Sequence, residues 1–235
     1  MSEPGRRDDR VAGRPKAVVS WSSGKDSAFA LWEIRRRAEL EVVGLLTTVT
    51  REFHRVSMHG VREELLERQA RATGLPLRTV EIPSPCPNEV YERAMGEEVA
   101  AMRADGVTHL VFGDLYLREI RDYRESRLGG TGMVPLFPLW GRPTGALARE
   151  MIASGLRANI VCLDPKRLDR RFAGRAFDAA LLADLPASVD PCGENGEFHT
   201  FVSAGPMFSA PVPVTLGETV ERDEFVFTDL RPGTG

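Results

Sequence analysis

The first half of the chain alternates short apolar runs with amphipathic segments. Buried strands are predicted where aliphatic residues run together, at 17–21, 42–48, 77–82 and 108–112. Helices are predicted where apolar residues recur at a helical period, at 26–38, 61–72 and 88–104. We expect Asn88 to cap the last of these helices. This alternation predicts an α/β fold, a parallel sheet with helices on both faces, which binds ligands at the carboxyl ends of its strands.

The pattern changes after residue 129, where closely spaced glycines and prolines interrupt the alternation. One more helix is predicted at 144–154, and short strands are predicted at 159–163, 198–202, 212–216 and 224–227. The chain is therefore expected to divide into a disordered leader and two folded parts, the second of them a smaller α+β domain, at 1–15, 16–131 and 132–235.

Composition and charge restrict the class of protein. Hydrophobic residues make up 42% of the chain, and the net charge is -3, with 31 basic and 34 acidic residues. Such a balance disfavours general nucleic-acid binding. No apolar run approaches the ~20 residues that span a membrane. The three cysteines lie far apart and match neither a disulfide framework nor a metal-binding pair, which favours a reducing, cytoplasmic location.

The strongest chemical signal is Ser-Trp-Ser-Ser-Gly-Lys-Asp-Ser at 20–27, where the first predicted strand turns into the first predicted helix. Small residues at 22–24 let backbone N–H groups converge on an anion, and the helix N-terminus faces the same anion. The segment is not a Walker A loop, because Val19 stands where the first glycine would be. We expect Asp26 to share a Mg²⁺ ion with the phosphates and Lys25 to neutralise their charge. The alternative is an ordinary turn with Asp26 as N-cap.

Lysine is rare in this chain, so its position in the loop is informative. Of the 31 basic residues only three are lysines, Lys16, Lys25 and Lys166. A compact ammonium fits a phosphate loop where a broad guanidinium does not.

A second group of polar residues occupies 192–199, Cys-Gly-Glu-Asn-Gly-Glu-Phe-His. Glu194, Asn195 and Glu197 are candidates for binding ammonium or a substrate amine, and His199 for positioning a nucleophile or stabilising a leaving phosphate. The alternative is a hairpin in which Asn195 and Gly196 form a type I′ turn and the acids face water.

Loops at the other strand ends add further candidates. Thr48, His59 and Gly113 lie at or near predicted strand ends, where a parallel sheet exposes its ligands, and His59 is equally compatible with a helix cap. Asp114 is expected to hold magnesium or substrate, or to cap the next helix. Arginines and acids at 118–127 are spaced three and four apart, which predicts a solvated helix face with internal ion pairs.

These motifs resemble known sequences. The segment at 22–27 resembles the pyrophosphatase-type PP-loop, usually SGGxDS, of the adenine-nucleotide alpha hydrolase-like superfamily, with Ser23 where glycine is usual. Within that superfamily the chain resembles the diphthine-ammonia ligase family from about residue 16 to 208. The resemblance is carried by the segments at 21–27, 55–60, 112–114, 138–140 and 190–202.

The resemblance implies a HUP-type ATP-binding domain followed by a substrate domain. It also implies an AMP-forming amide ligase that uses ATP and Mg²⁺, adenylates a carboxylate and couples it to ammonia with release of pyrophosphate. The carboxylate belongs to a small molecule or to a modified protein side chain. The residues then expected at the nucleotide are Ser22, Ser23, Gly24, Lys25, Asp26, Ser27, Thr48, His59 and Gly113. Those expected at the substrate are Asp114, Glu194, Asn195, Glu197 and His199, with Lys25, Asp26 and His199 as the catalytic group.

Two other functions compete with this one. A PP-loop sulfurtransferase acting on tRNA would need a reactive cysteine, yet Cys86 lies between two prolines and Cys162 lies in a predicted strand. A nucleotide sensor without turnover would not need the second polar group at 192–199. The sequence leaves a homo-oligomer open.

Overall fold

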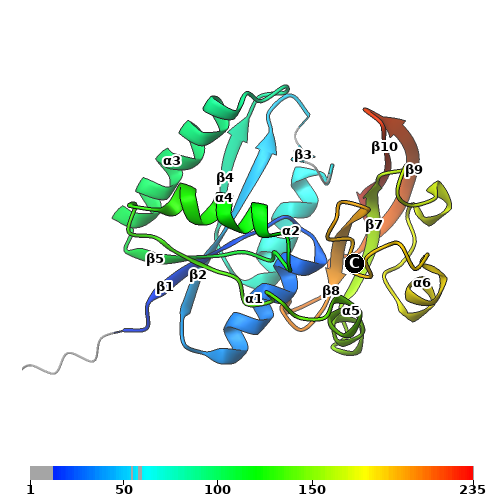
Figure 1. The fold of residues 1–235 in the computed structure, drawn as a ribbon, viewed down its shortest axis with the longest axis horizontal. Helices are drawn as coiled ribbons and strands as arrows, with labels where there is room; N and C mark the ends of the chain where they lie inside the picture. The colour runs from blue at the N-terminus through cyan, green and yellow to red at the C-terminus, as the bar shows by residue number, and fades with distance from the viewer. Residues whose placement is uncertain (1–12, 54, 58–59, 235) are drawn as a thin grey trace, which may run out of the picture.

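A computed structural model describes residues 13–53, 55–57 and 60–234. The predicted leader at 1–15 therefore lies mostly outside the described residues. The chain forms two sheets (Figure 1). The first contains β1 (Lys16–Ser20), β2 (Glu41–Thr50), β3 (Arg55–Val56), β4 (Leu77–Ile82), β5 (Val107–Val111) and β6 (Val134–Leu136). The second contains β7 (Arg157–Leu163), β8 (Phe198–Ala204), β9 (Val214–Arg222) and β10 (Phe225–Pro232).

The first sheet is parallel apart from one short strand. Its five parallel strands follow the order β4, β2, β1, β5, β6, and β3 pairs antiparallel with the last residues of β2 beyond the end of β1. The strand order reverses between β1 and β5, because the chain first moves outward from β1 on one side and then returns to the other. In parallel sheets this reversal is where ligands bind, at the carboxyl ends of the strands.

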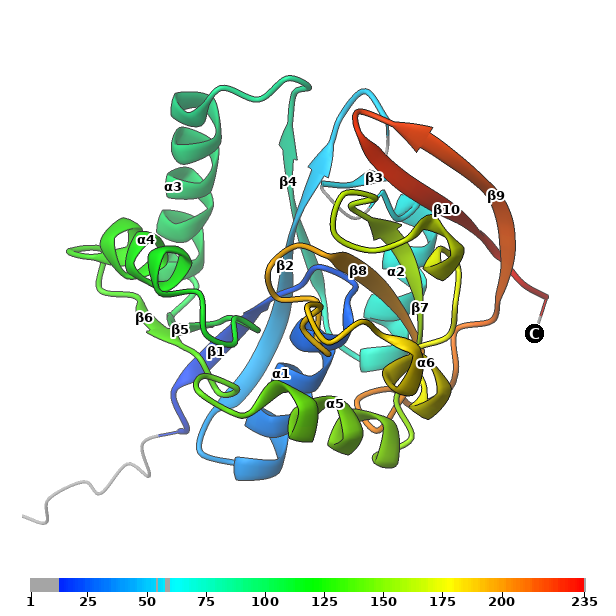
Figure 2. The same cartoon turned by 45° about the vertical axis from the view of Figure 1, so that its right-hand side comes forward.

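Helices cover both faces of the first sheet, as predicted. They are α1 (Lys25–Arg37), α2 (Glu63–Thr73), α3 (Asn88–Ala104) and α4 (Arg118–Leu128). Figure 2 shows α3 and α4 on one side of this sheet, and α1, α2 and the second sheet on the other. Residues of α3 and α4 share one apolar core with the sheet, while α1 and α2 belong to a larger core.

The second sheet is antiparallel, in the order β8, β7, β10, β9. Two further helices accompany it, α5 (Thr144–Ala153) and α6 (Ala179–Asp184), with a 3-10 turn at Arg170–Phe172. The larger core runs without interruption from α1 and α2 into this sheet, so the two halves of the chain are packed together by burial of apolar surface. No helix among the described residues is long and apolar enough to cross a membrane.

The predicted fold class is confirmed, and the differences are local. Asn88 does not cap α3, because it is the first helical residue, Pro87 precedes it, and no side chain caps the helix. The strand predicted at 212–216 begins at Val214 and continues to Arg222, through polar residues that show no apolar signal. The short β6 was not predicted, and it lies in the first sheet although its residues follow position 131.

Candidate functional site

The loop at 21–27 leaves several polar groups without partners. Ser23 has a φ of 68°, a left-handed conformation in which glycine is favoured, which explains why glycine is usual there. Its buried Oγ has no hydrogen-bond partner, and within the described chain the backbone N–H groups of Ser23, Asp26 and Ser27 have none either. Gly24, the N-cap of α1, has no side chain that could cap the helix, and of the first three helical N–H groups only that of Lys25 is bound, by Thr200. This combination of free N–H groups and a helix dipole is suited to an anion.

The side chain of Gln69, on α2, connects the loop at 21–27 to its surroundings through hydrogen bonds. Its buried side chain accepts a hydrogen bond from Trp21 Nε1 at 3.0 Å and donates to the carbonyls of Ser23 and Val202, at 3.1 and 2.7 Å. One amide thus connects the loop, α2 and β8. Sequence analysis missed Gln69, although a glutamine beside Leu65, Leu66 and Ala70 on the apolar face of a predicted helix was a usable signal.

The free edge of β8 meets the same loop. The N–H of Val202 donates to the carbonyl of Ser23 at 3.0 Å, and the hydroxyl of Thr200 accepts from the N–H of Lys25 at 3.1 Å. An edge strand has unpaired backbone groups that bind a neighbouring segment. Here they fix the loop to the second half of the chain.

The side chain of Lys25, within the loop at 21–27, is buried and only 2% exposed. Its Nζ donates to Asp26 Oδ2 at 2.8 Å and to the carbonyl of Cys192, and it lies 5.7 and 5.4 Å from the ring centroids of Phe177 and Phe198. Burial lowers the pKa of Lys25, but the Asp26 carboxylate and other acidic neighbours outweigh burial, so the pKa is raised. The ammonium therefore stays charged and joins the two polar segments.

Asp26 keeps one carboxylate oxygen free for a cation. Its Oδ2 binds Lys25, while its buried Oδ1 has no partner. Burial raises the pKa of Asp26 against the effect of Lys25, and Asp190 and Asp114 raise it further. No group of three or more potential metal ligands is assembled in the described part of the chain. A single carboxylate with a free oxygen fits Mg²⁺ that takes its other ligands from nucleotide phosphates and water.

Two residues at the end of β5 have clear structural roles. A Cβ on Gly113 would lie 2.8 Å from the backbone of Asp26 and Ser27, so only glycine permits this approach to α1. Asp114 forms an ion pair with Arg124 of α4, whose Nε is 2.8 Å from Oδ2. Asp114 does not cap α4, because the cap position is Leu117 and no side chain caps this helix.

The arginines of α4 are not all on a solvated face, contrary to the prediction from the sequence. Arg118 pairs with Asp122 and Arg121 with Glu125, as predicted for residues four apart. Arg124 instead turns toward the strand ends, where its guanidinium lies 4.4 Å from the ring centroid of Phe112. A pattern of charges along a helix does not reveal which arginine faces the protein.

A cavity of about 210 Å³ opens above the loop. It is lined by Trp21, Ser22, Thr48, Val56, Ser57, Tyr91, Phe112 and Arg124, among others. Its position at the ends of β1, β2 and β5 is the place expected for the nucleotide. Of the residues expected near the nucleotide, Ser22 and Thr48 line this cavity and Gly113 does not, while His59 lies outside the described residues.

The polar groups at 190–197 are used mostly within their own loop. Asp190 Oδ2 accepts from the N–H groups of Cys192 and Glu194, at 3.1 and 3.0 Å. Glu197 is 3% exposed, and its carboxylate accepts from the N–H groups of Asp190 and Asn195 and from the side-chain amide of Asn195. The hairpin alternative is wrong on both counts. A type I′ turn needs positive φ at two residues, which only Gly196 has, and Glu197 faces inward.

Glu194 is the acid of this loop that binds residues outside it. Its Oε1 accepts from the backbone N–H groups of Leu115 and Tyr116, at 2.7 and 3.3 Å, which joins the loop to the end of β5. Burial raises the pKa of Glu194 to about 7, partly offset by these hydrogen bonds. A carboxyl that titrates near neutrality is suited to accept or release a proton.

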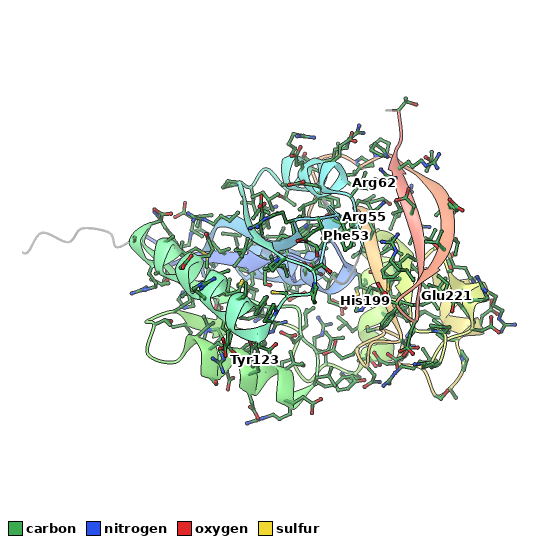
Figure 3. The ribbon with its side chains drawn as sticks, turned by 90° about the horizontal axis from the view of Figure 1, so that it is seen from above. Phe53, Arg55, Arg62, Tyr123, His199 and Glu221 are labelled. Atoms are coloured by element: carbon green, nitrogen blue, oxygen red, sulfur yellow. The ribbon has the colours of Figure 1, made fainter. Side chains whose placement is uncertain are left out.

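His199 lies on β8 between the two halves of the chain (Figure 3). Burial, reinforced by the positive charge of Lys25, lowers the pKa of His199 to about 4. The imidazole is therefore neutral at physiological pH, so it can form hydrogen bonds but supplies no positive charge to a leaving phosphate.

Comparisons with known proteins agree with this arrangement. Residues 15–133 match the family model described as the diphthamide synthase N-terminal domain, and residues 143–230 match the diphthamide synthase C-terminal domain. A diphthine-ammonia ligase of Danio rerio is 28% identical over 89% of this chain and 90% of its own length. The ligase of Rattus norvegicus is 27% identical over 89% and 86%, and that of Homo sapiens 28% over 72% and 69%.

Proposed function

Because the chain belongs to the diphthamide synthase family, we propose that it is an ATP-dependent ligase that joins ammonia to a carboxylate, as the names of its relatives indicate. The observation that carries the proposal is the loop at 21–27. It combines free backbone N–H groups at the start of a helix with an unpartnered carboxylate oxygen, and its first residues, Trp21 and Ser22, line a cavity at the strand ends. These are the groups needed to bind polyphosphate.

In the first step, a carboxylate oxygen of the substrate attacks the α-phosphorus of ATP. The bond from that phosphorus to the bridging oxygen breaks, and pyrophosphate leaves with the electron pair of the bond. The N–H groups of Asp26 and Ser27 stabilise the growing charge on pyrophosphate, and the Lys25 ammonium opposes the effect of burial on the pKa of Asp26. The chain contributes binding, orientation and charge, and no covalent intermediate with the protein forms.

In the second step, the lone pair of ammonia attacks the acyl carbon and AMP leaves with its bridging oxygen. The nitrogen loses one proton to give the neutral amide. We assign Glu194 to this proton, because it is held at the end of β5 and has a pKa of about 7. We assign Asn195 and Glu197 to holding the loop that presents Glu194, since their polar groups bind one another. We propose that Asp114 positions Arg124 through their ion pair. We propose that His199 acts as a neutral hydrogen-bonding group.

Magnesium fits this site through Asp26 Oδ1. When bound, it supplies charge neutralisation for the phosphates and holds them in place. We also propose a cytoplasmic location. Whether the active form is a homo-oligomer is a question for solution measurements.

Sulfur transfer to tRNA receives no support from Cys162 or Cys192. Burial raises the pKa of Cys162 to about 12 and raises that of Cys192 even more. Both thiols are buried, so neither forms the thiolate that carries a persulfide. Replacing Cys192 with serine and measuring turnover tests this option, because a sulfurtransferase would lose its activity.

The products of ATP distinguish the ligase from a sensor. The protein is incubated with ATP, ammonium and a substrate that carries diphthine, and the nucleotides are separated chromatographically. A ligase releases AMP and pyrophosphate in amounts equal to the amide formed. Release of ADP and phosphate contradicts the proposal, and tight ATP binding without products favours the sensor.

A further inference from the structure

The strand-end cavity, the cavity of about 210 Å³ at the ends of β1, β2 and β5, has one charged residue among the described residues that line it. That residue is Arg124 of α4, the helix that lies beside α3 on one side of the first sheet (Figure 2). The rest of the described wall consists of serines, threonines, one tyrosine and apolar side chains, without an acid. An anion that enters this cavity therefore meets a cation and no carboxylate.

Other cations on the same elements are already occupied. Lys25 is buried, and its Nζ binds Asp26 and a backbone carbonyl. Arg121, one turn before Arg124, pairs with an acid of its own helix and lies against two aromatic rings. Neither Lys25 nor Arg121 is among the described residues that line the strand-end cavity. A phosphate group there that the N–H groups of the loop at 21–27 do not bind has Arg124 as its available cation.

Arg124 is held in place, yet its guanidinium keeps free donors. Its Nη2 donates to Asp114 Oδ1 at 3.1 Å, and the guanidinium carbon lies 4.4 Å from the ring centroid of Phe112. The Nε lies 2.8 Å from Asp114 Oδ2, but neither of these buried atoms has an aligned hydrogen-bond partner. Within the described residues Nη1 makes no hydrogen bond either. An arginine fixed on one edge and one face has the rigid geometry that suits phosphate.

The ion pair presents its positive partner to the cavity. Asp114 does not line the strand-end cavity, and its side chain is 13% exposed against 29% for that of Arg124. Tyr91 of α3 lines the same cavity. Burial raises the pKa of the Tyr91 phenol, and the positive charge of Arg124 opposes this effect. The charge of Arg124 therefore acts within the cavity wall, although Asp114 balances it.

The proposed reaction places negative charge on the α-phosphate twice. In the first step the attacking carboxylate adds its charge to the α-phosphate while the bridging oxygen leaves with pyrophosphate. In the second step AMP leaves the acyl carbon, and its phosphate gains one negative charge. The N–H groups of the loop at 21–27 are assigned to pyrophosphate, so a different group has to stabilise the charge on the α-phosphate.

We propose that Arg124 is a catalytic residue that binds the α-phosphate of the nucleotide, with Asp114 and Phe112 as its positioning residues. Its free N–H groups donate to the non-bridging oxygens in both steps, and the guanidinium keeps its proton throughout. The inference rests on the proposed ligase function. It divides the nucleotide between two binding groups, pyrophosphate on the loop at 21–27 and the α-phosphate on Arg124.

The first test measures binding without turnover. AMP, adenosine and pyrophosphate are titrated separately, and binding is followed by ligand-observed NMR. The test variant combines Arg124→Met with Asp114→Asn, so that no unpaired carboxylate is left behind to unfold the site or to repel phosphate. The matched control combines Arg118→Met with Asp122→Asn, which removes an exposed ion pair of the same helix.

We expect the unaltered protein to prefer AMP to adenosine, and the test variant to lose this preference about tenfold, the scale of one charge-assisted hydrogen bond. Its affinity for pyrophosphate should stay the same, and the control should bind all three probes as the unaltered protein does. An unchanged preference for AMP in the test variant overturns the proposal. An equal loss of affinity for AMP and pyrophosphate also overturns it, because the whole site would then be disturbed.

The second test uses turnover and separates the two proposals. Release of pyrophosphate from ATP is measured with ammonium and the substrate that carries diphthine. We expect the test variant to lower kcat about a hundredfold, because a preorganised donor to the developing charge is lost. A loss below about tenfold overturns the Arg124 proposal alone. If the unaltered protein releases no pyrophosphate, the ligase proposal fails, and the AMP titration still decides whether Arg124 binds phosphate.

Discussion

Two polar segments meet at Lys25, and they use their polar groups differently. In the loop at 21–27, the Oγ of Ser23, the Oδ1 of Asp26 and several backbone N–H groups have no partner within the described chain. In the loop at 190–197, Asp190 and Glu197 bind the backbone of their own loop. The second segment is richer in charged residues, yet it offers fewer free groups.

The difference teaches that a dense polar motif and a ligand site are not the same thing. A buried polar group without a partner costs free energy, so a fold retains it only where a ligand or solvent completes it. We therefore propose that the loop at 21–27 binds a ligand and that the loop at 190–197 holds other groups in position. Glu194 is the exception, because it reaches out of its loop to the end of β5.

Removal of the ammonium that joins the segments should have the largest effect. Lys25→Met leaves Asp26 buried without its cation, and breaking such a pair costs about 3 to 5 kcal/mol. Urea unfolding of Lys25→Met, Asp26→Asn and the double variant measures the coupling between the two residues. The double variant should be more stable than the sum of the single changes predicts. If the losses of stability in the two single variants simply add in the double variant, Lys25 and Asp26 do not stabilise each other.

Gln69→Leu should have the next largest effect. It leaves the indole N–H of Trp21 and the carbonyl of Val202 without their partner, at a cost of about 2 to 3 kcal/mol of stability. The control is Glu67→Leu on the exposed side of the same helix, which should change stability by about 0.5 kcal/mol or less. If the two variants lost equal stability, the hydrogen bonds of Gln69 would not be needed to stabilise the loop at 21–27.

Gly113→Ala tests the first loop from its other side. The new Cβ would collide with the backbone of Asp26 and Ser27, so we expect a loss of about 1 to 3 kcal/mol and much weaker ATP binding. Gly96→Ala in α3 is the matched control, since nothing lies within 4 Å of its Cβ position and alanine favours a helix. Unfolding curves and ATP titrations measure both variants. Unchanged ATP affinity in Gly113→Ala would contradict the role of this contact.

The second loop should show a pH dependence of stability. The pKa of Glu194 is raised from 4.5 to about 7, so the folded state binds more protons than the unfolded state between these values. Its ionisation therefore destabilises the fold progressively as the pH rises from about 4.5 to about 7. Glu194→Gln still accepts hydrogen bonds from Leu115 and Tyr116 but does not titrate, and should flatten this part of the melting-temperature profile. A profile that keeps its slope would assign the titration to another group.

The order of elements and the turn from β1 into α1 were predictable, because both depend on local pattern. Aliphatic runs separated by amphipathic segments determine the parallel sheet, and small residues at 22–24 mark the turn after β1. The partners of these residues were not predictable, because they lie far along the chain. Lys25 binds the carbonyl of Cys192, and Gln69 binds Val202. No local period shows that Glu197 faces inward or that Arg124 turns toward Phe112.

The most direct test of the central claim is an amide NMR titration of the 15N-labelled protein with magnesium pyrophosphate. The claim is that the loop at 21–27 receives the anion and the loop at 190–197 does not. We expect saturable shifts of the Ser23, Asp26 and Ser27 amides, and little change in the Cys192 and Asn195 amides, which are already bonded within their loop. Saturable shifts at 190–197 with none at 22–27 would contradict the account.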